Sequence, residues 1–502
     1  MLRERANATA LTFFDMTNAM KSIPKNHILM KMKSLLDWSR FEAILKDYYD
    51  PSLGRPSDAL VLLRMLILEH FANLSDRQAH EQVGYNLLYR AFVGLSPEES
   101  VPDDTTLVKF RQRLGADGVQ RIFDELIKQL DEMGLIGKYR RVTDGSNIWA
   151  NVAARRYLDV LRIGRRKLIE AIAEVDEQRA VELASRYLEA GDSDECSGDC
   201  EELESKEKEL CKELLDEVAG VEESRVKEMA SILEEMLEPR GRPVSFDDPD
   251  ARWGHKSREK RFLGYKVHEA IDPDSRIITS VDVHPGNVDE SVHTGELLGK
   301  EKASRAKGAV VIADNLYAKA GVIEQIRAAA CKPCIAKMRK PGLIQSFDYD
   351  PETDQLICPE GKRSIGKVRI RNGYQYYFSM KDCSVCPRKG RCLTHGERYG
   401  KAQQRRRVYL SDVRKEELTA GEAGLSWRRE QLKKRGYIEA KFAEQMNIHG
   451  MRRARYRGLK KVLMQVLFNA LAVNLKRAAK LFYNMGSTKR KRSPPQLTLS
   501  WC

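Results

Sequence analysis

The chain has 502 residues, of which 42% are hydrophobic and 32% are charged, and its formal net charge is +14 at pH 7. This length is too great for one ordinary core, and this composition excludes an intrinsically disordered or fibrous protein, so we expect several folded domains. The N-terminus lacks the sustained apolar core of a secretory signal, and the most apolar late stretch, residues 462–475, is too short for a membrane span. We therefore expect a cytoplasmic protein without membrane contact.

Charge is distributed unevenly along the chain. Residues 191–240 hold 18 acidic and 6 basic side chains, whereas residues 445–502 hold 13 Lys or Arg residues and no Asp or Glu. A one-signed basic field attracts polyanions, which makes nucleic acid the leading candidate partner. The alternative is a basic surface that only keeps the protein in solution.

Residues 25–137 carry helical patterns throughout. Apolar residues recur at helical spacing over 58–73, and Leu74-Ser75-Asp76 supplies a break and an N-cap before the next helix. Residues 101–106 then open another helix, which carries Arg111 and Arg113. We predict that residues 1–137 form a helical DNA-binding domain, and the alternative is a scaffold that binds nothing.

Strand patterns begin after this domain. A short β-branched run ends at Asp144, and a helical, acidic insertion is expected over 155–239. Strands return in three runs, 262–271, 277–283 and 309–313, with a hairpin turn at 272–275 between the first two. We predict that 138–154 and 240–330 form one mixed sheet.

The last part of the chain changes character twice. Residues 331–425 are rich in cysteine and form a predicted insertion, and two long helices follow at about 426–446 and 458–482. These helices, within 426–482, are expected to complete the domain of the sheet. The basic tail, 483–502, is expected to be disordered.

Three carboxylates stand in contexts that suit a catalytic site. Asp144 and Asp314 each end a short apolar strand pattern, and Glu439 lies in a helical segment. Two aspartates delivered by a sheet and a glutamate from a helix can hold two divalent cations against a phosphodiester. The alternative for each acid is a helix cap or a surface carboxylate.

Several ordered stretches carry a resemblance to a known family. They are GRPSDALVLLRMLILEHFANLSDRQ (54–78), VPDDTTLVKFRQRLG (101–115), TDGSNIWANVA (143–153), DPDARWGHKS (248–257), FLGYKVHEAID (262–272), VVIADNLYAK (310–319), RGYIEAKF (435–442) and RYRGLKKV (455–462). With them the chain resembles the bacterial insertion-sequence transposases of the DDE type, in the group with an all-helical N-terminal module. The resemblance implies an α/β fold with a ribonuclease H-like mixed sheet flanked by helices.

The resemblance also implies a function. Asp144, Asp314 and Glu439 correspond to the three catalytic acids of the family, with Mg²⁺ or Mn²⁺ as two bound ions. The implied protein is a DNA transposase that binds terminal inverted repeats and catalyses strand cleavage and strand transfer. It would work as a homodimer or larger homo-oligomer on double-stranded DNA in the nucleoid. The alternatives are a catalytically impaired or repurposed sequence-specific DNA-binding protein and a nuclease without a joining step.

Two positions depart from the family pattern around Glu439. Arg435, four residues earlier on the same helical face, matches the family's arginine and is a candidate DNA contact. Leu432 stands where the family has a tyrosine, and Met446 stands where it has a lysine. Lys441 is a candidate substitute for that lysine. The two departures favour the catalytically impaired alternative.

Further DNA contacts are expected from exposed basic and aromatic residues. The basic candidates before the last helix are Arg452, Arg453, Arg455 and Arg457. Trp253 is a candidate to stack on an extruded base, and the alternative is an anchor for its loop.

The cysteines of the insertion have spacing that suits structural zinc. Cys358, Cys383, Cys386 and Cys392 include a CxxC pair, and tetrahedral thiolate sites stabilise small insertions. The alternative is unligated thiols. Cys331-x2-Cys334 is a rival pair, and His395 is a replacement ligand for the first set. Two strand histidines, His268 and His284, are expected to pack near the site rather than to act in catalysis.

Overall fold

The computed structural model places most of the chain. It describes residues 21–49, 58–188, 200–238, 241, 243–256, 259–336, 347–370, 373–393, 405–419 and 421–488. The candidate ligand His395 and the tail beyond residue 488 lie outside the described residues. None of the described helices is long and apolar enough to cross a membrane.

The N-terminal region is helical, as predicted. Its helices are α2 (Ile28–Leu35), α3 (Trp38–Lys46), α4 (Ala59–Ala72), α5 (Asp76–Tyr85), α6 (Leu87–Val93) and α7 (Asp104–Glu132). The predicted cap of α5 is confirmed, because Ser75 and Gln78 form a reciprocal capping box. Asp58 and Asp103 cap α4 and α7 more simply. In each, a side-chain oxygen accepts hydrogen bonds from backbone N–H groups of the first turn.

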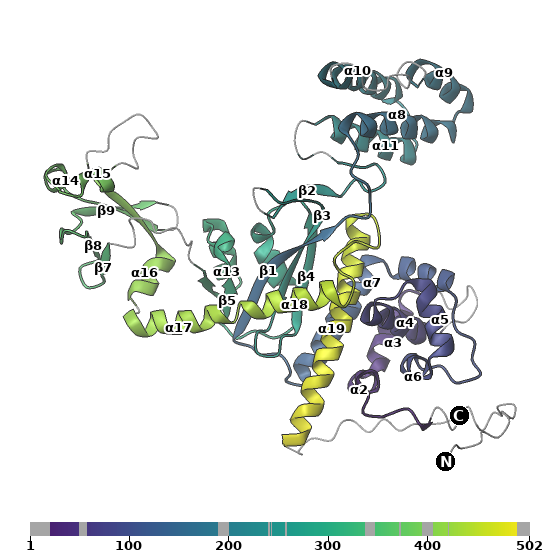
Figure 1. Ribbon diagram of the computed structural model, residues 1–502, viewed down its shortest axis with the longest axis horizontal. Coiled ribbons are helices and arrows are strands. Elements are labelled where there is room, and N and C mark those ends of the chain that lie inside the picture. The colour runs from purple at the N-terminus through teal and green to yellow at the C-terminus, as the bar shows by residue number, and fades with distance from the viewer. Residues whose placement is uncertain are drawn as a thin grey trace, which may run out of the picture.

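A six-stranded mixed sheet forms the centre of the molecule (Figure 1). Its strands are β1 (Arg140–Trp149), β2 (Arg252–His255), β3 (Arg261–Ile271), β4 (Ile278–Pro285), β5 (Val310–Ala313) and β6 (Lys332–Ile335). The order is β4-β3-β1-β5-β6, with β3 antiparallel to β1 and β4, and β5 and β6 parallel to β1 and to each other. The predicted mixed sheet is therefore confirmed.

Two strands were not predicted, and one is longer than predicted. β2 pairs with the outer part of β3, and β6 extends the sheet beyond residue 330. β1 continues to Trp149, so Asp144 lies in mid-strand and the expectation that it ends a strand is wrong. The turn-forming Gly145-Ser146 pair misled the prediction, because cross-strand pairing with β3 keeps both residues extended.

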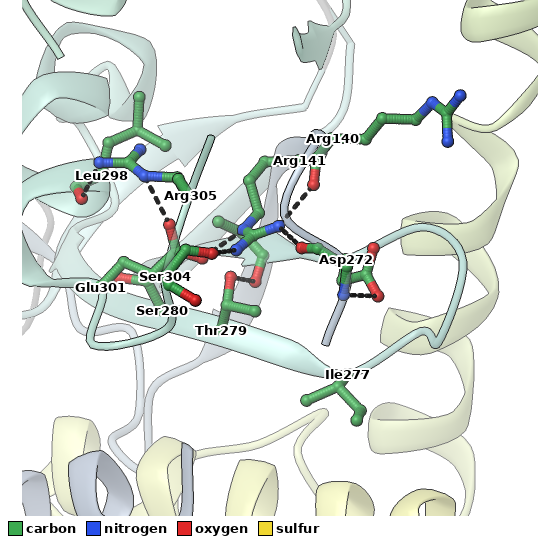
Figure 2. Close-up of polar contacts among 12 residues, drawn as sticks. Arg140, Arg141, Asp272, Ile277, Thr279, Ser280, Leu298, Glu301, Ser304 and Arg305 are labelled. Atoms are coloured by element: carbon green, nitrogen blue, oxygen red, sulfur yellow. Dashed lines mark hydrogen bonds and ion pairs between the residues drawn. The ribbon is translucent and has the colours of Figure 1, made fainter. Parts of the chain in front are cut away.

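A buried ion pair fixes the start of β1. The guanidinium of Arg141 pairs with the carboxylate of Glu301, and both side chains are fully buried. Arg141 also donates to the carbonyl oxygen of Gly137 at 2.5 Å. The guanidinium Nε of Arg305 forms an ion pair with the other oxygen of Glu301 at 3.0 Å (Figure 2). A buried charge is tolerated only when it is paired, so this network holds the 298–305 segment against β1.

Helices cover both faces of the sheet. They are α12 (Thr294–Lys300), α13 (Ala320–Ala328), α17 (Gly421–Lys433), α18 (Gly436–Asn447) and α19 (Leu459–Thr488), with the short 3₁₀ turns η1 (Glu290–His293) and η2 (Asn315–Tyr317). α18 packs on β1, and α19 lies between β4 and the N-terminal helices (Figure 1). The helix predicted over 426–446 is two helices that break at Lys434-Arg435, and α19 runs beyond the predicted end at residue 482.

Two segments with cores of their own extend from the sheet (Figure 1). The first is the predicted helical insertion, with α8 (Tyr157–Ala173), α9 (Glu177–Tyr187), α10 (Cys200–Val218) and α11 (Ser224–Leu237). The second holds β7 (Asp348–Asp350), β8 (Gln355–Ile357), β9 (Gly366–Ile370), β10 (Gly373–Tyr377), β11 (Arg407–Ser411), α14 (Met380–Ser384), α15 (Lys389–Cys392) and α16 (Asp412–Thr419). The division of the chain into domains at the residues given above stays a prediction.

Candidate active site

Asp144 lies on β1, where its backbone pairs with Glu269 of β3. Its Oδ1 accepts a hydrogen bond from the backbone N–H of Gly145 at 2.9 Å. Burial raises the pKa of the Asp144 carboxyl to about 6, and the negative charges of Asp314 and Glu439 act in the same direction. The carboxyl can therefore exchange its proton for a cation near neutral pH.

Asp314 follows β5 directly and caps η2, because its Oδ1 accepts a hydrogen bond from the N–H of Leu316 at 2.8 Å. β5 runs parallel to β1, and the last pair in their register is Val142 with Ile312. Two residues further along each segment are Asp144 and Asp314, so the register brings both to one region of the sheet. Burial raises the pKa of Asp314 as well.

Glu439 lies in the first turn of α18, and its side chain is 58% exposed. The guanidinium Nη2 of Arg435 donates to Glu439 Oε1 at 3.0 Å. This contact confirms that the two side chains share a face, although a helix break at Arg435 replaces the continuous helix predicted there.

Arg435 acts electrostatically on all three acids. Burial lowers its pKa, but the bond to Glu439 and the charges of Asp144 and Asp314 outweigh burial and raise the pKa overall. In turn, the positive charge of Arg435 opposes the rise in the pKa of both aspartates and offsets part of it. One guanidinium therefore balances part of the negative charge that β1, η2 and α18 bring together.

The chemistry of these acids suits a divalent cation. They offer hard oxygen donors, and their charges repel one another. As the side chains stand, no three His, Cys, Asp or Glu side chains of the described residues are gathered closely enough to hold one ion. Binding a cation would thus require the carboxylates to turn toward it while Arg435 gives way.

Glu290 of η1 is a further carboxylate near the site, and sequence reasoning missed it. A Cβ on Gly145 would meet Glu290 Oε1 at 2.5 Å, so a larger residue at that position of β1 would displace the Glu290 side chain. Glu290 forms an ion pair with Lys266 Nζ at 2.7 Å, and its charge contributes to the raised pKa of Asp314. The available signal was an acid shortly after the end of a predicted strand.

The residues that depart from the family pattern are packed inside. Leu432 packs against the main core, and the sulfur of Met446 accepts a weak hydrogen bond from Ser146 Oγ at 3.9 Å. Lys441 is only 4% exposed and its Nζ pairs with Glu444 at 2.9 Å. Its ammonium group is therefore held by Glu444, and its role as a substitute for the family's lysine stays a prediction.

Three of the four predicted arginines form an exposed group. Arg452, Arg453 and Arg457 lie in the loop between α18 and α19. The loop is tied to the far end of β1, where the N–H of Trp149 donates to the carbonyl of Arg452 at 3.1 Å and the N–H of Ala454 donates to the carbonyl of Trp149 at 2.7 Å. Trp149 is itself 47% exposed and was not predicted as a contact.

Arg455 has a different role. Its Nη1 donates to Glu69 Oε1 of α4 at 2.7 Å and to the carbonyl of Leu74 at 2.7 Å. In the structure its guanidinium thus binds the N-terminal helices, and the DNA contact of this residue stays a prediction.

Trp253 of β2 is 43% exposed and lines a cavity of about 800 Å³ beside the start of α8. Cationic and aromatic side chains dominate the lining, and these are Arg155, Tyr157, Arg252, His255 and Arg261. Among the described residues, no carboxylate lines the cavity. Such a lining suits an aromatic, anionic ligand, and base stacking by Trp253 stays a prediction.

The four predicted zinc ligands face one cavity. Cys358, Cys383, Cys386 and Cys392 line a cavity of about 680 Å³ in the cysteine-rich segment. Burial raises the pKa of Cys392, and the other three thiols add to the rise. Within the described residues they are not close enough to form a metal cluster as they stand. The rival residues Cys331 and Cys334 are instead buried in the main sheet.

The strand histidines pack, as expected. His268 is fully buried, and its Nε2 lies 2.8 Å from Thr143 Oγ1 and 3.1 Å from the Tyr317 hydroxyl. Burial lowers the pKa of His268 to about 3, so the ring is neutral at physiological pH. His284 stacks on His293 with ring centroids 4.2 Å apart.

Comparison with known proteins identifies the family. Residues 17–113 match the model of a transposase domain (DUF772), and residues 238–475 match the model of a transposase DDE domain. Asp314 and Glu439 lie within the second match, whereas Asp144 lies between the two. A cryo-EM structure of a piggyBac transposase synaptic complex with hairpin DNA is 10% identical, covers 96% of this chain and 78% of its own, and has a TM-score of 0.33, too low to carry an argument.

The two family matches span the N-terminal helices and the region from the end of α11 to α19. They confirm the resemblance carried by the ordered sequence stretches, and they do not favour the alternative of a repurposed DNA-binding protein. The chain belongs to the DDE transposases of insertion sequences, which are DNA transposition enzymes that generally use divalent metal ions.

Proposed function

We propose that Asp144, Asp314 and Glu439 are the catalytic acids of this transposase. The observation that carries the proposal is the meeting of three carboxylates from three separate elements around one guanidinium, that of Arg435. A structural role would not require two further acids to raise the pKa of Asp144 at a partly exposed site.

The proposed cofactors are two Mg²⁺ or Mn²⁺ ions. When bound, the ions activate an attacking water or 3′-hydroxyl and stabilise the leaving oxygen of an in-line displacement. The protein would contribute the carboxylate oxygens. Asp144 would lose its proton before it binds an ion. Arg435, released from Glu439, would be free to bind a DNA phosphate through its planar fork of donors.

The proposed substrate is double-stranded DNA with terminal inverted repeats, and the reactions are strand cleavage and strand transfer. Arg452, Arg453 and Arg457 would hold the backbone where β1 ends, and Trp253 would stack on a base outside the duplex. Because phosphate contacts release counterions, affinity should fall steeply with salt. Pairing two ends requires at least a dimer, so we propose a homo-oligomer on DNA in the nucleoid.

Strand cleavage of a labelled duplex that carries the inverted repeats flanking the gene tests the acids. We expect Asp144→Asn, Asp314→Asn and Glu439→Gln each to lower Mg²⁺-dependent cleavage by about 10²–10³-fold or more, because each removes a charged oxygen from the site. The matched control is Glu430→Gln, which changes an exposed glutamate on the neighbouring helix α17.

Binding of the same duplex shows that each variant is folded. Wild-type cleavage by Asp144→Asn or Asp314→Asn would show that the site is assigned wrongly. Specific binding by the wild-type protein without any nicking would instead support the catalytically impaired alternative.

A further inference from the structure

A small basic cavity lies behind the helix that carries Glu439. It has a volume of about 150 Å³ and is formed by α18, α19 and the turn between β3 and β4. Its lining residues are Arg276, Tyr437, Ala440, Lys441, Glu444, Lys476, Arg477 and Lys480. Tyr437, Ala440 and Glu444 share one face of α18, and Glu439 points from another, so the cavity is separate from the candidate active site.

Positive charge in this cavity exceeds negative charge. Five of the lining residues are Lys or Arg, and the lone carboxylate of the lining is Glu444. Glu444 is already shared by Lys441 at 2.9 Å and Lys476 at 2.6 Å. Among the described residues, no carboxylate lies within ion-pair distance of the other three cations, which are Arg276, Arg477 and Lys480.

Crowding of these cations has an electrostatic effect. Burial lowers the pKa of Arg477, and the positive charge of Arg276 lowers it further. The Nε of Arg477 donates to the carbonyl of Ser275 at 2.7 Å, which fixes the guanidinium beside the turn. A bound anion would relieve this repulsion.

Arg276 occupies a strained position that a different residue would fill more easily. Its φ is 62°, in the left-handed region that favours glycine or asparagine, and its N–H donates to the carbonyl of Asp272 at 2.7 Å. Its guanidinium carbon lies 4.3 Å from the ring centroid of Tyr437. The turn therefore bears the cost of a side chain that places a cation at the cavity, and such strain clusters at functional positions.

We propose that this cavity binds a phosphate group, and that the phosphate belongs to the backbone of DNA. The size suits a single tetrahedral oxyanion rather than a nucleotide, and guanidinium forks match phosphate oxygens. Lys480 and Ala440 are exposed at the rim, where a backbone can approach. The choice of DNA rests on the proposed function, whereas the anion site itself does not. A phosphate held here would brace α18 from the side opposite Glu439.

The first test uses the salt dependence of DNA binding. Fluorescence anisotropy of a mixed-sequence duplex is measured with the full chain and with Arg276→Asn/Arg477→Gln. Asparagine tolerates the left-handed turn, so the variant should keep its fold. We expect weaker binding at low salt and a slope of log K against log salt that is smaller by about 0.9, the loss of one phosphate contact. Lys227→Gln, an exposed lysine of the acidic insertion, is the control and should leave the slope unchanged.

The second test separates DNA from free phosphate. Inorganic phosphate is added at millimolar concentration, and the unfolding temperature is followed for the wild type and the double variant. An unchanged salt slope with stabilisation of the wild type alone would overturn DNA as the ligand and assign the cavity to free phosphate. No difference in either measurement would overturn the site. Asp144→Asn should lose cleavage yet keep the wild-type slope, so failure of the catalytic assignment is distinguishable from failure of this one.

Discussion

Glu269 shows how strongly the environment of a single residue is set by the fold around the site. It pairs with Asp144 across the sheet, is completely buried and accepts a hydrogen bond from Gln445 Nε2 at 2.8 Å. Its second oxygen and the side-chain oxygen of Gln445 have no partner among the described residues. A proton on Glu269 would let the two side chains form a second hydrogen bond.

Replacing Glu269 by glutamine tests this environment through pH. Burial raises the pKa of Glu269 to about 7 from its ordinary value of 4.5. Its contribution to stability is therefore present below about pH 4.5 and is lost as the pH rises through 7. We expect Glu269→Gln to match the wild type at pH 4.5 and to be more stable by about 1–3 kcal/mol at pH 8. Urea unfolding of both proteins at both pH values measures the difference in the free energy of unfolding. The same difference at pH 4.5 and at pH 8 would contradict the prediction.

Most residues of the candidate site could be predicted from the sequence, but their arrangement in space could not. Asp314 was predicted at a strand end because a β-branched run leads directly into it, and the structure agrees. Asp144 was placed at a strand end for the same reason, yet pairing with β3 carries the strand past it. Glu290 was missed because its proximity to Gly145 depends on tertiary packing that no local pattern encodes.

At the scale of elements, the helix that carries Glu439 is shorter than its sequence suggests. Most residues from 426 to Arg435 are good helix formers, so a continuous helix over 426–446 is predicted, although Gly436 is a weak one. The chain instead breaks at Lys434-Arg435, where Lys434 pairs with Asp274 of the hairpin turn at 2.6 Å. Tertiary contacts thus override local propensity and turn Arg435 toward the acids.

The cysteine-rich segment gives a prediction at the same scale. Its strands enclose only a small core, so a zinc ion would add stability that packing cannot supply. We predict one zinc per chain in wild-type protein and none in Cys383→Ser/Cys386→Ser, as measured by elemental analysis. Cys331→Ser, in the main sheet, is the control and should keep the metal. Ten reactive thiols and no zinc in purified wild-type protein would rule the site out.

For the whole molecule, Arg455 ties the N-terminal helices to the domain of the sheet. It pairs with Glu69, which is 1% exposed and also lies 3.6 Å from Arg111 of α7. Sequence could not predict this contact, because the partners are far apart in the chain and Arg455 lies in a loop rather than in a helical pattern. Charge composition predicts a DNA contact for Arg455, and the docking of α4 against the loop shows its contact with Glu69 in addition.

Removing Arg455 should loosen this junction. Burial raises the pKa of Glu69 to about 8, so the test is made at pH 9, where Arg455→Ala leaves a buried carboxylate with one of its two cations. We expect a loss of roughly 2–3 kcal/mol in the free energy of unfolding at that pH. Chemical denaturation measures the loss, and limited proteolysis should show faster cleavage between the N-terminal helices and the sheet. Glu69→Gln combined with Arg455→Ala should lose less than the single change, because no buried charge is then left behind. Equal losses would show that the junction does not depend on this ion pair.

The acidic insertion leaves and rejoins the sheet at nearly one point. Trp149, where β1 ends, and Arg252, where β2 begins, both pair with Gly264 of the intervening strand. Since neighbouring strands are about 4.8 Å apart, the two ends lie roughly 10 Å from each other. The helices between them have a core of their own. This position therefore suits the insertion or removal of a whole module. Evolution or an engineer can replace the helices by a short linker without changing the order of the strands.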